Sequence, residues 1–200
     1  MAAPIVNVNG FATSVPTDTT QFHQKGEVIL NSEPSVNEPF GWVCVADGRP
    51  GTWQALDSVP HGALYNTVVT VSAAELAALR ATPKTLVSAP GAGYVLKFEG
   101  ATLLLDYTAP AFTETADNFV IRYNNGSGVA VSDVIENTGF IDQTADMITH
   151  AVPVKDPIVS KANGENKALV LHNNGDGELA GGGGSAVRVV ISYRIVPTGF

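Results

Sequence analysis

Apolar and polar residues alternate along much of this chain, and the alternation predicts an all-β protein. The clearest stretch is Ala186–Val196, near the C-terminal end. Side chains of a strand point alternately to its two faces, so a period of two separates a core-facing set from an outward set. The predicted core-facing set is Val187, Val189, Ile191, Tyr193 and Ile195.

Further strands are predicted where β-branched and aromatic residues run between Gly, Pro, Asn and Asp. These runs are Gly26–Asn31, Gly41–Ala46, Thr52–Leu56, Thr67–Val71, Lys84–Ala89, Tyr94–Tyr107, Asn118–Tyr123, Val129–Ile135 and Lys167–His172. The long run Tyr94–Tyr107 is expected to bend or bulge at Gly100, because glycine inside a strand often marks a bulge. The segment Asn124–Gly128 predicts the turn of a hairpin.

One short helix is expected between two of these strands. Ser72 and Glu75 have the spacing of a capping box, in which the serine side chain accepts a hydrogen bond from a free backbone N–H and the glutamate returns one. Leu76 and Leu79 would then face the core. Pro83 ends the helix, because the residue before a proline avoids helical geometry.

The chain is expected to divide near Ser58–Gly62, where proline and glycine favour a linker. Residues 1–20 are predicted to form an extended arm on a neighbouring subunit, because they bury little surface alone. Residues 21–60 are predicted to form a small aromatic-rich β module. Residues 61–200 are predicted to form a β-sandwich of jelly-roll type with one short helix.

The small module is expected to have a core that one chain alone does not complete. Three short strands bury little surface, so Phe40, Trp42 and Trp53 are expected to form a core that another chain completes. Stacking of the two tryptophans on sugar rings is the alternative. The residues expected to contact other subunits or a capsid are Ile5, Val8, Phe11, Phe22, Phe40, Trp42 and Trp53.

The size, charge and hydrophobicity of the chain limit the kinds of partner it is expected to bind. The 200 residues, of 20.8 kDa, suffice to bury a core without a disulfide or a metal. A net charge of -8 and a pI of about 4.8 disfavour nucleic acid and anionic membrane surfaces as partners. Residues 1–10 lack the regions of a signal peptide, and no run approaches the roughly 18 apolar residues of a membrane span. Synthesis in the cytoplasm is therefore expected.

No motif predicts a catalytic residue, a cofactor or a metal ligand. Gly181–Ser185 lacks the lysine of a phosphate loop and precedes a strand, so a flexible loop is expected. Asn173–Glu178 has too few carboxylates for an EF-hand, so a turn is expected. Cys44 is expected to be a small buried residue. The histidines could meet only in the fold or on a symmetry axis between copies; they are His23, His61, His150 and His172.

Two stretches of the chain resemble phage proteins. Gly26–Pro34 and Gly41–Trp53, with the pattern GWVCV followed by PGTW, resemble a small module of phage tailspike and fibre proteins. Ala81–Gly93 and Asn137–Asp146 are similar to uncharacterised phage virion proteins, some of them encoded among head genes. The chain lacks the long β-helix that carries hydrolysis in tailspikes, which disfavours an enzyme that cleaves polysaccharides.

The resemblance implies a non-enzymatic structural protein of a phage virion. The first hypothesis is a capsid decoration, or cement, protein that binds the major capsid protein on the outer capsid surface as a homotrimer. The alternative is a head or tail fibre knob that binds a host receptor or glycan through Trp42, Trp53 or the loop at Asn173. Neither hypothesis involves nucleic acid or a membrane.

Overall fold

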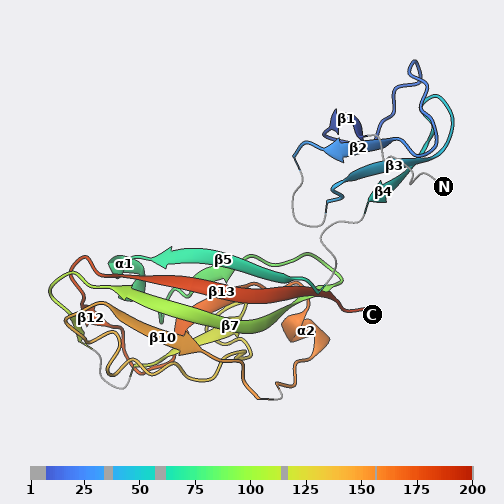
Figure 1. Ribbon diagram of the computed structural model, residues 1–200. Helices are drawn as coiled ribbons and strands as arrows, with labels where there is room; N and C mark the ends of the chain where they lie inside the picture. Colours follow the sequence, from blue (N-terminus) through green and yellow to red (C-terminus); the bar gives the residue numbers. More distant parts are fainter. Residues whose placement is uncertain (1–7, 34–37, 57–61, 114–116, 156, 200) are drawn as a thin grey trace, which may run out of the picture. The chain divides into compact units, whose positions relative to one another are not determined.

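The chain folds as two units, each built on β-sheet (Figure 1). The computed structural model describes residues 8–33, 38–56, 62–113, 117–155 and 157–199. The units are Met1–Pro60 and His61–Phe200. The predicted all-β class is confirmed. Most of the predicted linker, residues 58–61, lies outside the described residues.

The N-terminal unit contains a four-stranded sheet. Its strands are β1 (Val8–Ala12), β2 (Val28–Asn31), β3 (Gly41–Ala46) and β4 (Thr52–Leu56), and they lie in that order. β1 runs parallel to β2, and the remaining pairs are antiparallel.

The arm predicted for residues 1–20 needs correction. Phe11 lies opposite Leu30, and Ala12 lies opposite Asn31, so residues 8–12 pair within their own chain. Pairing there satisfies backbone N–H and C=O groups that the edge of β2 would otherwise expose.

The C-terminal unit is a β-sandwich. Its strands are β5 (Leu64–Val71), β6 (Lys84–Val87), β7 (Tyr94–Asp106), β8 (Phe112–Thr113), β9 (Phe119–Tyr123), β10 (Met147–Ala151), β11 (Leu169–Asn173), β12 (Ala180–Gly181) and β13 (Ala186–Pro197). One sheet has the order β10-β7-β13-β5, and Figure 1 shows these strands side by side. A second sheet has the order β6-β11-β9, and β12 pairs with β8. This arrangement does not confirm the jelly-roll form of the prediction.

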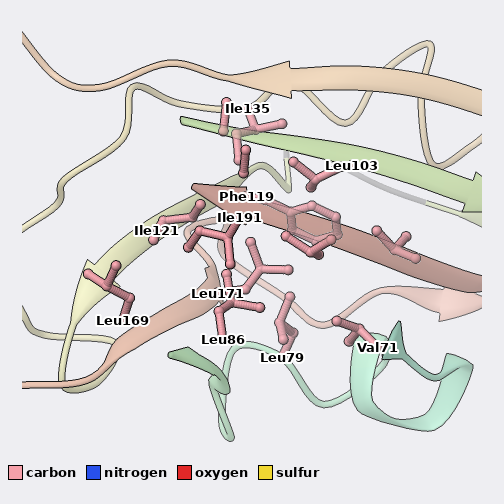
Figure 2. Close-up of a cluster of buried hydrophobic side chains, with 14 of the residues drawn as sticks. Val71, Leu79, Leu86, Leu103, Phe119, Ile121, Ile135, Leu169, Leu171 and Ile191 are labelled. Carbon is pink, nitrogen blue, oxygen red and sulfur yellow. The ribbon is translucent and has the colours of Figure 1, made fainter. Parts of the chain in front are cut away.

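The core of the sandwich lies between the two larger sheets. Leu103 of β7 and Ile191 of β13 come from one sheet, and Phe119 of β9 and Leu171 of β11 come from the other. Figure 2 shows these side chains in one cluster, and none of the four has exposed surface. Removal of this apolar surface from water is the main stabilising contribution in the sandwich.

β7 keeps both of its halves against this core by means of a bulge. Ser192 of β13 pairs with Gly100, but the next residue, Tyr193, pairs with Phe98, so β7 carries one extra residue. Regular alternation would send Phe98 and Ala101 to opposite faces, whereas the bulge buries both. Gly100 has a φ of +152°, which a glycine adopts without a steric cost. The predicted bulge is confirmed.

The predicted capping box is also confirmed. In front of α1 (Ala73–Leu76), the Ser72 N–H donates to the Glu75 carboxylate at 2.9 Å, and the Glu75 N–H donates to Ser72 Oγ at 3.4 Å. Leu76 and Leu79 are fully buried, as the spacing predicts.

The prediction of a single helix is wrong, because a second short helix, α2 (Lys161–Gly164), is present. The side chain of its N-cap residue, Ser160, makes no capping hydrogen bond. Serine is a favoured N-cap residue, but Asn163 stands where a capping box needs Glu or Gln, so the local sequence carries only a weak signal for this helix.

The strand predicted at Val129–Ile135 is wrong as well. Only isolated bridges form there, one of which joins Ala130 to Arg122. The Ser132 hydroxyl accepts the Ile121 N–H at 2.8 Å and so takes a donor that a regular ladder would give to a carbonyl. The hairpin turn is present, but its return segment is irregular.

Candidate interaction surface

The N-terminal sheet has a very small apolar core. Among the described residues of this unit, the buried hydrophobic side chains are Val28, Trp42 and Cys44. The C-terminal sandwich, by contrast, buries a cluster that draws on both of its larger sheets. Hydrophobic burial has to offset the conformational entropy of an ordered chain, so a module with this little burial is marginal by itself.

The two tryptophans face inward to different degrees. Trp42 is buried in β3, as predicted for a core residue. Trp53, in β4, is half-buried, and its Nε1–H donates to the Pro50 carbonyl at 2.8 Å. Its ring meets the His23 ring edge-on, with centroids 4.9 Å apart, and His23 Nδ1 lies 2.8 Å from the Glu27 carboxylate. These contacts make the tryptophans part of the module's interior packing and leave no open sugar platform at Trp42.

Large apolar side chains lie exposed on this module. The exposed fractions are 72% for Phe11, 48% for Phe22, 45% for Phe40 and 39% for Val15. Phe11, Val15 and Phe22 line one depression of about 660 Å³, with Ile29 at its wall. We call this depression the apolar groove after these side chains; it is lined by residues 10–18, 21–23, 27 and 29, and polar residues such as Asp18, Gln21 and Glu27 make up much of the rest of its lining. Exposed apolar patches typically mark contact sites for other molecules.

Polar contacts hold the segment that carries Phe22. The Asp18 carboxylate accepts hydrogen bonds from the Thr20 hydroxyl at 2.7 Å and the Thr20 N–H at 2.8 Å, and these bonds lower the pKa of Asp18. Arg49 donates to the Thr20 carbonyl, and its guanidinium carbon lies 5.8 Å from the centre of the Phe22 ring. The cation beside the ring adds a cation–π contact that favours this placement of Phe22.

Two of the predicted contact residues meet at the apolar groove, namely Phe11 and Phe22. Ile5 lies outside the described residues, and Val8 begins β1. Val15 also lines the groove but was not predicted, because a single valine between Ser14 and Pro16 gives no periodic signal.

Phe40 does not belong to the core that the single chain forms; whether another chain covers it stays a prediction. Its carbonyl accepts the Asn31 N–H at 2.7 Å, so its backbone joins β2, but 45% of the residue is exposed. Phe40 does not line the apolar groove. It is therefore a separate exposed aromatic residue of the same module.

The structure gives little support to a metal site or a reactive cysteine. No group of three His, Cys, Asp or Glu side chains within the described ranges is placed to hold a metal ion. His61 lies outside those ranges. Cys44 is buried, and its thiol donates to the Ala46 carbonyl at 3.1 Å.

The glycine-rich segment is not an open loop, which corrects the expectation of a flexible loop. Gly182 is buried, and a Cβ added there would lie 2.1 Å from the Phe112 ring. The Ser185 hydroxyl donates to the Thr108 carbonyl and accepts the Thr108 N–H, each at 2.8 Å. The segment is therefore a packed turn that joins β12 to β13 and lies against residues 108–112.

Comparison with protein-family models, with curated proteins and with solved structures finds no match to this chain. In the part of the chain that the structure describes, no helix is long and apolar enough to cross a membrane. The fold and the apolar groove define a class: an all-β protein whose smaller unit exposes apolar side chains beside a minimal core.

Proposed function

We propose that this chain is a structural protein of a bacteriophage particle, a capsid decoration or cement protein that binds the major capsid protein on the outer capsid surface as a homotrimer. One coincidence carries the proposal. The module whose segments Gly26–Pro34 and Gly41–Trp53 resemble a phage tailspike and fibre module is also the module that exposes Phe11 and Phe22 beside a minimal core. The proposal assigns no catalytic activity to the chain.

In this proposal, sister copies of the chain cover the apolar groove. Oligomerisation commonly stabilises a module whose own core is too small to be stable alone. An interface of ordinary size buries about 800 Å² per partner, and each Å² of apolar surface contributes roughly 25 cal/mol before the costs of association. Many trimers on one shell then resist internal pressure together through multivalency. The net charge of -8 disfavours stray binding to DNA.

Light scattering on the purified chain tests the trimer. The expected mass is three times 20.8 kDa. The double substitution Phe11→Ser and Phe22→Ser should reduce the mass to that of the monomer, because it removes the aromatic rings that line the groove. The matched control is Val68→Ser, since Val68 is 57% exposed on the sandwich, and this variant should remain trimeric. A wild-type chain that is monomeric at high concentration would refute the trimer.

Copy number tests the location on the particle. A cement protein should be present in hundreds of copies, and a fibre tip in about a dozen, as expected from the symmetry of the shell. Gel densitometry of purified virions against the major capsid protein measures this ratio. A ratio far below one excludes the cement role.

The second candidate is a head or tail fibre knob that binds a host receptor or glycan. The burial of Trp42 disfavours this residue as a sugar platform. A different observation favours the candidate: next to the loop at Asn173 lies a polar depression that His172 and Arg80 help to line.

A further inference from the structure

The polar depression lies on the side of the β6-β11-β9 sheet that faces away from the sandwich core. Leu169 and Leu171 of β11 point into the core, so His172 lies on the opposite side of the sheet. Three segments far apart in the sequence meet there and border an open depression of about 550 Å³. We call this site the arginine pocket; its lining residues are Arg80, Ala81, Pro83, Asn125, Gly126, Ser127, His172, Asn174 and Gly175.

His172 is buried at the pocket wall, and its surroundings disfavour the protonated ring. It is 9% exposed, and its Nδ1 is buried without a hydrogen-bond partner. Gly126 packs directly on the ring, since a Cβ added there would lie 2.6 Å from Nε2. Burial lowers the pKa of His172, and the charges of Arg122 and Arg80 lower it further, whereas a hydrogen bond to the Arg80 backbone and the charge of Glu178 raise it; the net direction is downward.

The two arginines beside His172 are not paired with carboxylates. Arg122 donates to the Gly128 carbonyl at 3.0 Å and to Asn174 Oδ1 at 2.5 Å, both neutral acceptors. Among the described residues, no ion pair joins Arg122 or Arg80 to an acidic side chain.

The carboxylate of Glu178, the nearby acid, accepts hydrogen bonds from backbone amides. Its carboxylate accepts the Arg80 N–H at 2.9 Å and the Ala81 N–H at 2.7 Å. It therefore fixes the corner of the chain from which the Arg80 side chain extends. The charges that act on His172 are therefore two cations, Arg122 and Arg80, and one anion, Glu178, which leaves a local surplus of one positive charge in a chain with a net charge of -8.

We propose that the arginine pocket binds an oxyanion, supplied either by the carboxylate of an acidic sugar or by a free inorganic oxyanion. The exposed guanidinium of Arg80 offers the fork of donors that recognises such groups. Asn125, Ser127 and Asn174 contribute amide or hydroxyl groups to the lining, and groups of this kind bind sugar hydroxyls. Arg122 supports the site from below, because it holds Asn174 in place. This site lies in the C-terminal unit and is independent of the cement role.

Calorimetric and NMR titrations of the full chain test the site with glucuronate, with inorganic sulfate and with neutral glucose. Both anions should bind, and glucose alone should not. Arg80→Gln should weaken anion binding by about tenfold, the effect of losing a charge-assisted hydrogen bond. The matched control is Arg188→Gln, because Arg188 is an exposed arginine in a strand of the other large sheet. This variant carries the same change in charge and should alter the affinity less than about twofold.

The two anions distinguish the source of the oxyanion. Tighter binding of glucuronate than of sulfate supports an acidic sugar, and equal or weaker binding of glucuronate supports an inorganic oxyanion. Chemical-shift changes should centre on residues 125–127 and 172–175. Absence of binding by both anions overturns the proposal, and so does an equal loss of affinity in Arg80→Gln and Arg188→Gln.

Discussion

The two neighbouring leucines of β7 provide a matched test of how the sandwich is stabilised. Leu103 has no exposed surface and lies in the core between the two sheets (Figure 2). Leu104, the next residue, is half-buried on the outer face of the same strand. Replacement of each by alanine removes the same atoms from the same strand, so the two variants differ mainly in burial.

The magnitude follows from the atoms removed. A leucine-to-alanine change deletes about three carbons, each worth about 0.8 kcal/mol when fully buried, or about 2.4 kcal/mol in total. At Leu103 the cavity left behind raises the loss to about 3–5 kcal/mol. At Leu104 the side chain is partly solvated and leaves no cavity, so about 1 kcal/mol is expected. The free energy of unfolding of the two variants should therefore differ by at least about 2 kcal/mol.

The two units can be followed separately in one urea titration. Both tryptophans belong to the N-terminal unit, so tryptophan emission reports its unfolding. The far-UV circular dichroism signal comes mostly from the larger sandwich. Leu103→Ala should lower the midpoint of the dichroism transition and leave the tryptophan transition in place. Equal losses for Leu103→Ala and Leu104→Ala would refute the view that this face of β7 is the core.

Three further predictions concern separate features. Ser72→Ala should lower the stability of the sandwich by about 1 kcal/mol in urea, because it removes the N-cap of α1. The Lys84 ion pair, together with the hydrogen bonds from Ser72, lowers the pKa of Glu75 from 4.5 to about 2. The ionised Glu75 therefore contributes its full stabilisation of the folded state above pH 4.5, and this stabilisation is lost as the pH falls towards 2. Between pH 4.5 and pH 2, the free energy of unfolding should fall less for Glu75→Gln than for the wild-type chain. His172 has its folded pKa lowered below 6.5, so stability should decline as the pH falls below 6.5, and a profile flat from pH 7 to pH 5 would contradict this.

A substitution in the N-terminal sheet makes the complementary test. A Cβ at Gly41 would lie 2.3 Å from the Ile29 carbonyl oxygen and 2.9 Å from Leu30 Cα, both of which are backbone atoms of β2. Gly41→Ala should therefore push β2 and β3 apart and cost roughly 1–3 kcal/mol. The tryptophan transition should move to lower urea, whereas the dichroism transition should stay. A shift of both transitions by the same amount would contradict the assignment of Gly41 to a separately folded unit.

Some features of this fold are local, and the sequence was enough to predict them. The alternation in Ala186–Val196 predicts β13 and its buried face, because the direction of a side chain in a strand depends only on its parity. The capping box at Ser72 predicts α1, because its hydrogen bonds join residues three apart. Gly100 marks the bulge, because the positive φ of the backbone at this position favours glycine over other residues.

Other features depend on which segments become neighbours, and only the tertiary structure decided them. The run Val129–Ile135 has the composition of a strand, yet Ser132 interrupts its pairing. Phe11 and Phe22 are large apolar residues of the kind usually buried in a core, yet both remain exposed in this chain. Their burial depends on whether another element of the structure covers them. The arginine pocket joins segments near residues 80, 125 and 174, which meet only through the pairing of β9 with β11 and the placement of α1. Pairing between distant strands leaves no local pattern in either strand. The sequence therefore named Phe11 and Phe22 as contact residues but could not show that they line one groove, and it could not assemble the arginine pocket.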